Sequence, residues 1–322
     1  MVSDVSLVPA NLANFALQSC LYGVYLVLAV TSICLIIGRN GSSTRRGPSI
    51  YWSPIFLGAI GLSLTITAHW ILVVNQAFLA FIHSPNSSGP LAFYGNLSEI
   101  TEVVKTGFLV ATVIIGDALI IHRLWIVWGY NKYVIVFPIA TLLGLAASGA
   151  GITYQFTQYE PGQIVFLTEA GRWITSETAF TLCTHGYSTA FIAWRLWNHG
   201  RRAKTIQPYG GRSLRSVLAV IVESAAIYTI WTIFFIATYQ SQSNLQFIAV
   251  DCWPAITGIS CMLIHVRVGM GWAQMEDEKP STLSGGTQLS SIAVNITRVR
   301  HTSMGFDYPM DEVIEEGNKG MV

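Results

Sequence analysis

The sequence predicts an all-α protein, a bundle of seven transmembrane helices with its N-terminus outside and its C-terminus in the cytoplasm, followed by a disordered tail. Two observations predict this fold class. Hydrophobic residues make up 52% of the 322 residues and charged residues only 11%, whereas a soluble domain has about 25% charged residues. The apolar residues form seven long stretches, and the basic residues collect on one side of them.

Each of the seven stretches is long enough to be a membrane span, because a helix needs roughly 20 apolar residues to cross a bilayer core of about 30 Å. Apolar residues follow the second stretch as far as Phe81, so this helix could tilt or project from the membrane. The predicted divisions are an extracellular N-terminus (1–14), a transmembrane domain (15–271) and a cytoplasmic tail (272–322). The stretches are Phe15–Ile37, Pro54–Asn75, Val103–Trp128, Tyr133–Tyr154, Ser176–Trp197, Leu214–Tyr239 and Leu245–Gly271.

The basic residues set the predicted orientation. All of the 18 lysines and arginines except Lys105 and Arg172 lie at the same side of the membrane in this prediction. They lie in or next to the connections after the first, third and fifth stretches, or in the tail. Cytoplasmic loops carry the excess of Lys and Arg in membrane proteins. We therefore expect the N-terminus outside, with the first stretch acting as an uncleaved anchor.

Two groups of residues near the predicted inner face suggest interfacial anchors. Arg123 and Arg195 end helices that run inward, where a long cationic side chain can reach the lipid headgroups. Trp125, Trp128 and Trp197 lie beside them, and tryptophan is enriched at membrane interfaces. We expect membrane lipids to contact all five side chains.

Glycosylation sequons are consistent with this orientation. Asn86 and Asn96 each begin an Asn-x-Ser motif in the second connection, which is expected outside, so both are candidate N-glycosylation sites. Asn40 and Asn295 also begin sequons, but they fall on the expected inner side and should remain unmodified.

Five ionisable residues lie at membrane depth, where such groups are costly and usually face the protein interior or water. We treat them as candidates for a ligand-binding or switch site; the alternative is that they form buried polar pairs that only fix helix packing. They are His69, Asp117, His185, Glu223 and Asp251.

Asp117 is the most deeply placed of them. It follows Val103 by 14 residues, which corresponds to about 21 Å along a helix. Arg123 does not share its helical face, so a partner on another helix is expected, with His69 or His185 at similar depth.

Asp251 lies nearer the predicted outer face, where it could meet Lys105. Such a contact would be either an interfacial ion pair or part of an outward-facing pocket.

The cytoplasmic segments suggest partner binding. The basic connection at 199–213 could bind a cytoplasmic signalling partner or anionic lipid. The tail is acidic and contains several Ser and Thr residues, so it is either a solvated tail or a phosphorylated docking segment. The net charge of +1 gives no indication of nucleic-acid binding.

One motif carries a family resemblance. Gly116-Asp117 is followed by His122-Arg123-Leu124-Trp125 and then by Trp128. In this the chain resembles a large group of uncharacterised seven-span membrane proteins from mushroom-forming (basidiomycete) fungi. The resemblance implies seven helices, an outside N-terminus and a receptor-like layout, but no ligand and no catalytic residue.

Several function classes can be weighed from the sequence. A retinal protein needs a lysine in the last span for its Schiff base, and residues 245–271 contain none. No repeated histidine spacing suggests a metal site, and we expect neither a cofactor nor an enzyme. The remaining alternatives are a receptor-like sensor of unknown ligand and a small-solute or proton-coupled transporter. Either would be an integral multi-pass protein of the plasma membrane or an endomembrane.

Overall fold

The computed structural model describes residues 6–41, 54–82, 89–159, 169–206 and 211–277. All regular secondary structure in these ranges is helical. The helices in chain order are α1 (Leu7–Gly41), α2 (Pro54–Ile82), α3 (Gly89–Tyr94), α4 (Ile100–Val127), α5 (Lys132–Thr157), α6 (Glu169–Ile206), α7 (Gly211–Gln240) and α8 (Leu245–Asp277).

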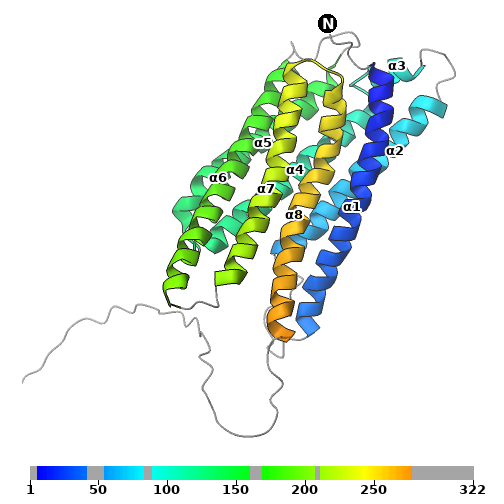
Figure 1. Ribbon diagram of the computed structural model, residues 1–322. Coiled ribbons are helices and arrows are strands. Elements are labelled where there is room, and N and C mark those ends of the chain that lie inside the picture. Colours follow the sequence, from blue (N-terminus) through cyan, green and yellow to red (C-terminus); the bar gives the residue numbers. More distant parts are fainter. Residues whose placement is uncertain (1–5, 42–53, 83–88, 160–168, 207–210, 278–322) are drawn as a thin grey trace, which may run out of the picture. The chain divides into compact units, whose positions relative to one another are not determined.

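The long helices run side by side as a bundle, and the short helix α3 lies at one end of it (Figure 1). Helix α4 packs against α2, α5, α6 and α8, while α1 packs mainly against α8, and α7 lies between α6 and α8. Every residue from Asp251 to Met262 of α8 is buried. Helices α4 and α8 therefore supply much of the interior, where polar groups can be held away from lipid.

Six of the described helices are long and apolar enough to cross a membrane: α1, α2, α4, α5, α7 and α8. Large apolar side chains point away from the bundle, for example Val27, Leu64, Leu143 and Ile230, each 65–68% exposed. A soluble protein rarely exposes apolar patches of this extent. The chain is accordingly a multi-pass integral membrane protein.

The remaining expected stretch, Ser176–Trp197, the fifth in chain order, is helical as part of α6 but is too polar to qualify by composition. Two other boundaries also differ from expectation. Helix α1 begins at Leu7, before the expected start of the first stretch at Phe15, so residues 7–14 continue the first helix. Helix α8 continues to Asp277, past the expected start of the tail at residue 272, and the rest of the tail lies outside the described residues.

The connection between α4 and α5 is a tight turn that fixes these two helices as antiparallel neighbours. Gly129 and Tyr130 both have a φ of 64°, a conformation that glycine adopts without steric cost. Asn131 caps α5 by accepting a hydrogen bond from the Tyr133 backbone N–H at 3.0 Å. The turn keeps the ends of α4 and α5 in register.

Candidate functional site

A cluster of polar side chains is buried at the end of the bundle where α1, α4, α6 and α8 begin, which we call the N-terminal end. Helices α1, α2, α4 and α8 contribute to it, so it joins residues far apart in the sequence. We call it the Lys105 cluster; its members are Asn14, Gln18, His69, Gln76, Glu102, Lys105 and Asp251.

The Lys105 ammonium is the centre of this cluster. Its Nζ atom lies 3.1 and 3.2 Å from the two carboxylate oxygens of Asp251. It also lies 2.8 Å from Glu102 Oε2 and donates to Gln76 Oε1 at 3.1 Å. Gln76 in turn donates to Glu102 at 2.9 Å. The pair that the sequence suggested between Lys105 and Asp251 is therefore present, with two further partners.

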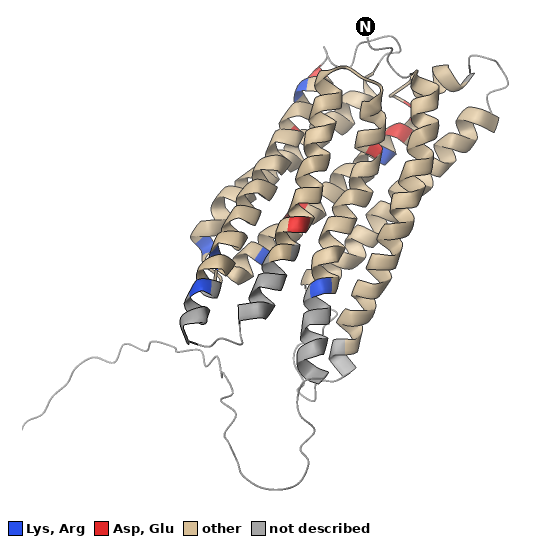
Figure 2. Cartoon of the chain, in the orientation of Figure 1, with Lys and Arg blue, Asp and Glu red and all other residues tan. Residues whose placement is uncertain are grey.

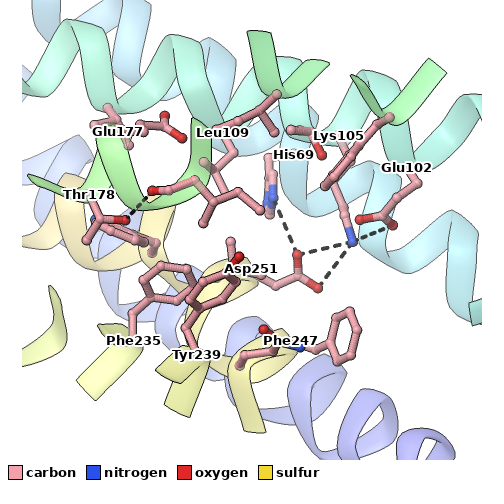
Figure 3. A pocket seen from close by; sticks show the side chains of 18 of the residues that line it. His69, Glu102, Lys105, Leu109, Glu177, Thr178, Phe235, Tyr239, Phe247 and Asp251 are labelled. Carbon is pink, nitrogen blue, oxygen red and sulfur yellow. Dashed lines mark hydrogen bonds and ion pairs between the residues drawn. The ribbon is translucent and has the colours of Figure 1, made fainter. Parts of the chain in front are cut away.

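Helices α1 and α2 complete the surroundings of Asp251. Asn14 Nδ2 donates to Asp251 Oδ2 at 2.6 Å. His69 Nε2 lies 4.0 Å from Asp251 Oδ1, as Figure 3 shows. The other ring nitrogen of His69 is 2.9 Å from Gln18 Nε2. His69 thus belongs with Asp251, and not with Asp117 as the sequence allowed.

The charged members of this cluster are buried, so each one needs its partners. His69 is fully buried, and Asp251 and Lys105 are only 3% and 6% exposed. A buried charge is tolerated when an opposite charge and hydrogen bonds satisfy it, and removal of one partner leaves the other uncompensated. The cluster therefore holds the N-terminal ends of α4 and α8 together with α1 and α2.

A second buried group lies deeper in the bundle, where α4 meets α6 and α7. Asp117 Oδ1 is 2.7 Å from His185 Nε2 and accepts a hydrogen bond from Thr181 at 3.2 Å. The Thr181 hydroxyl is also 2.7 Å from the Tyr228 hydroxyl, and the His185 ring stacks on Tyr228 with centroids 3.8 Å apart. Asp117 thus has a partner on another helix, as expected, and the partner is His185.

The fifth candidate, Glu223, does not face the interior. Its side chain is exposed, while Ser224 and Tyr228 on the neighbouring face of α7 are buried. Packing of these two residues sets the rotation of α7 and turns Glu223 outward. Glu223 joins neither buried group and is not part of the site.

The expected anchors divide into two kinds. Arg123 does not reach outward, because its Nη2 lies 2.9 Å from His265 Nε2 and 3.3 Å from the Cys261 carbonyl oxygen, both on α8. Arg195 instead covers the ring of Trp128, with 5.1 Å between its Cζ and the centroid.

Trp125 packs edge-on against Tyr130, and Trp197 is 54% exposed beneath the Arg201 guanidinium. Arg123 is therefore a contact between α4 and α8, whereas Trp125, Trp128 and Arg195 are half-buried and Trp197 is exposed.

A cavity of about 100 Å³ adjoins the Lys105 cluster and is lined from α2, α4, α5, α6, α7 and α8. Its walls are mostly apolar and aromatic, with Phe235 and Phe247 on α7 and α8 (Figure 3). Lys105 and Asp251 line one part, and Glu177 and Thr181 of α6 line another. A largely apolar pocket with a few polar groups is the usual form of a small-molecule site.

Some residues of this site were missed from the sequence. Asn14, Gln18 and Gln76 are uncharged, and a search for ionisable groups passes over amides. Their presence in apolar helices, with Asn14 and Gln18 four residues apart on one helical face, is the signal that could have found them. Glu177 was overlooked because it falls near the start of an expected span.

Two features lie at the surface beside the site. The pKa of the Tyr94 phenol on α3 is raised above its usual value because burial disfavours the phenolate, so Tyr94 remains a hydroxyl donor near neutral pH. Asn96, in the turn before α4, accepts hydrogen bonds from the Ser98 backbone N–H at 3.3 Å and hydroxyl at 2.7 Å. Asn86 lies outside the described residues.

Within the described residues no group of three or more His, Cys, Asp or Glu side chains is placed to hold a metal ion. Comparison of the chain with protein-family models, with curated proteins and with solved structures finds no match. The function must therefore be argued from the cavity and the two buried polar groups.

Proposed function

We propose that this protein is a seven-span, receptor-like membrane protein that binds a small molecule in the cavity beside the Lys105 cluster. The observation that carries the proposal is the cavity itself, which six helices line and which reaches buried charges at one end of the bundle. A molecule bound there would contact most of the long helices at once. Its binding can therefore favour one arrangement of the bundle over another.

The buried contacts below the cavity offer a route for such a change. Thr181 lines the cavity and also bonds to Asp117 and to Tyr228. Trp253 lines the cavity as well, and its ring packs against that of Tyr228. A ligand that moves Thr181 or Trp253 thus acts on the Asp117–His185 pair, which links α4 to α6 in the interior.

The distribution of polar residues on α6 supports a seventh span. Its buried polar residues recur at three- and four-residue intervals and so share one face. This face points into the bundle, where Thr181 and His185 have partners. The low hydropathy of α6 therefore comes from residues that lipid would not contact. They are Thr178, Thr181, Thr184, His185 and Ser188.

The described charges favour the N-terminal end as the outer one. All but two of the Lys and Arg positions that are coloured in Figure 2 lie toward the opposite end; the two exceptions are Lys105 and Arg172, near the starts of α4 and α6. With the cytoplasm at that opposite end, the cavity lies nearer the outside or the lumen. The basic segment at 199–213, which the structure makes the end of α6 and the start of α7 and not a long connection, and the tail are then available to a cytoplasmic partner. This is the layout that the resemblance to the basidiomycete seven-span proteins implies.

The test of ligand binding is a thermal-stability screen of the purified full-length protein with small amphipathic molecules of positive, neutral and negative charge. A binder of the folded state raises the melting temperature by mass action. Thr106 lines the cavity, so Thr106→Phe fills it and should abolish the shift. Val104→Phe is the matched control, because Val104 is 42% exposed on the same helix. If no molecule gives a shift that Thr106→Phe removes, ligand binding in this cavity is refuted.

A proton-coupled transporter is the second candidate, because the Asp117–His185 pair places an acid and a base deep in the bundle below the cavity. Such pairs occur in proton relays of pumps and transporters. The test is solute or proton flux into proteoliposomes, compared between the unmodified protein and Asp117→Asn. Flux that Asp117→Asn abolishes would favour transport over sensing.

A further inference from the structure

Glu177 differs from the other charged groups of the cavity because it has no counter-charge. It lies eight residues after the start of α6, or about 12 Å along the helix. Its Oε1 atom is buried and has no hydrogen-bond partner among the described residues. Figure 3 shows Glu177 on the side of the cavity away from Lys105 and Glu102.

The lining holds more acidic than basic side chains. Lys105 is the one Lys or Arg among the residues that line the described cavity, and Glu102 and Asp251 already neutralise it at 2.8–3.2 Å. Glu177 adds a third carboxyl group. An anionic ligand would find no unpaired cationic side chain in this lining, whereas a cationic ligand would supply the opposite charge that the Glu177 carboxyl lacks.

The other side chains that line the cavity can pack against the apolar part of an organic cation. Phe156, Phe235, Phe247 and Trp253 present aromatic surface to the cavity, and aromatic faces attract ammonium groups as well as apolar ones. The volume of about 100 Å³ limits the ligand to a molecule smaller than benzene, because benzene occupies an apolar cavity of about 150 Å³ in another protein.

We propose that the cavity binds a small primary or secondary amine, with its ammonium group on Glu177 and its apolar body against the aromatic side chains. This assignment rests on the proposed ligand-binding function and names the chemical class of the ligand. The ammonium N–H groups would donate to the unpartnered Glu177 oxygen. Such a charge-assisted hydrogen bond is among the stronger polar contacts available to a ligand.

The experiment uses three probes of similar shape and different charge. Propylamine, 1-propanol and propionate are each titrated against the purified full-length protein at pH 7, and the melting temperature is recorded. Propylamine should give a saturable rise, and the other two should give none at the same concentrations. Equal or larger shifts with propionate or 1-propanol, or no shift with propylamine, would overturn the amine assignment.

Variants connect the response to Glu177. Glu177→Gln keeps the size of the side chain and should weaken propylamine binding roughly 10- to 100-fold, as expected for loss of a charge-assisted bond. Glu169→Gln is the matched control, because Glu169 is exposed on the same helix and pairs only with Arg172 among the described residues. An unchanged propylamine affinity in Glu177→Gln would refute the proposed contact.

The probes also separate the two proposals. A propionate or 1-propanol shift that matches or exceeds the propylamine shift and that Thr106→Phe abolishes would overturn the amine assignment while supporting the binding cavity. Absence of any shift sensitive to Thr106→Phe in the wider screen would refute the proposed function itself. If Glu177→Gln does not fold, the comparison of the three probes on the unmodified protein still decides the assignment.

Discussion

Replacement of Lys105 by Met tests whether the buried polar cluster holds the bundle together. Methionine matches the length of lysine but removes the ammonium group that lies within 3.2 Å of Asp251, Glu102 and Gln76. Asp251, only 3% exposed, would lose its counter-charge. Loss of one member of a buried ion pair costs about 3–5 kcal/mol of unfolding free energy.

The assay is thermal unfolding of the purified protein in detergent, followed by tryptophan fluorescence. A loss of 1 kcal/mol lowers the melting temperature by about 2–4 °C in a chain of 150–250 residues, so Lys105→Met should lower it by about 10 °C. Addition of Asp251→Asn to Lys105→Met should recover part of this loss, because the second change removes the unpaired charge and keeps an acceptor for Asn14.

The control is Arg172→Met at the same end of the bundle. Arg172 and Glu169 form an exposed pair at 3.1 Å, and exposed pairs contribute only about 0–1 kcal/mol. If Lys105→Met changes the stability no more than Arg172→Met does, the idea that a compensated buried charge network supports these helices is refuted.

Three further predictions concern packing, the deeper polar pair and orientation. Gly116→Ala should destabilise the fold by about 1–3 kcal/mol, because its new Cβ would lie 2.6 Å from Thr257 Cγ2 across the α4–α8 contact. Gly107→Ala is the control: a Cβ there has no atom within 4 Å, so the melting temperature should be unchanged or slightly higher. Asp117→Asn should lower the unfolding free energy by about 1–3 kcal/mol, because a buried carboxylate with two partners on α6 is lost; an unchanged melting curve would contradict this. Asn96→Gln should remove one endoglycosidase-sensitive band shift on gels, and an unmodified Asn96 in the parent protein would argue against an outside second connection.

Helix positions were predictable from the sequence because membrane spans need long apolar stretches, and each of the seven expected stretches coincides with a long helix. The contact between Lys105 and Asp251 was also within reach, since both lie within two turns of the start of their helices. Because both helices begin at the same end of the bundle, these two residues lie at similar depth and can pair.

The direction in which an individual side chain points, into the bundle or outward, was not predictable from the sequence. Glu223 lies among apolar neighbours, yet it is turned outward because adjacent residues on α7 are about 100° apart around the helix and the buried face is that of Ser224 and Tyr228. Arg123 was expected at the lipid interface, but carbonyl and imidazole groups on α8 accept its contacts. Such choices depend on which helices are neighbours, and the order of spans does not supply that information.

Protease protection of the two termini is the measurement that tests the seven-span proposal most directly. The full-length protein would carry one epitope tag at each end and be inserted into sealed microsomes. Seven crossings with the N-terminus in the lumen predict that added protease removes the C-terminal tag and leaves the N-terminal tag intact. Removal or protection of both tags together would show an even number of crossings, and it would mean that α6 does not span the membrane.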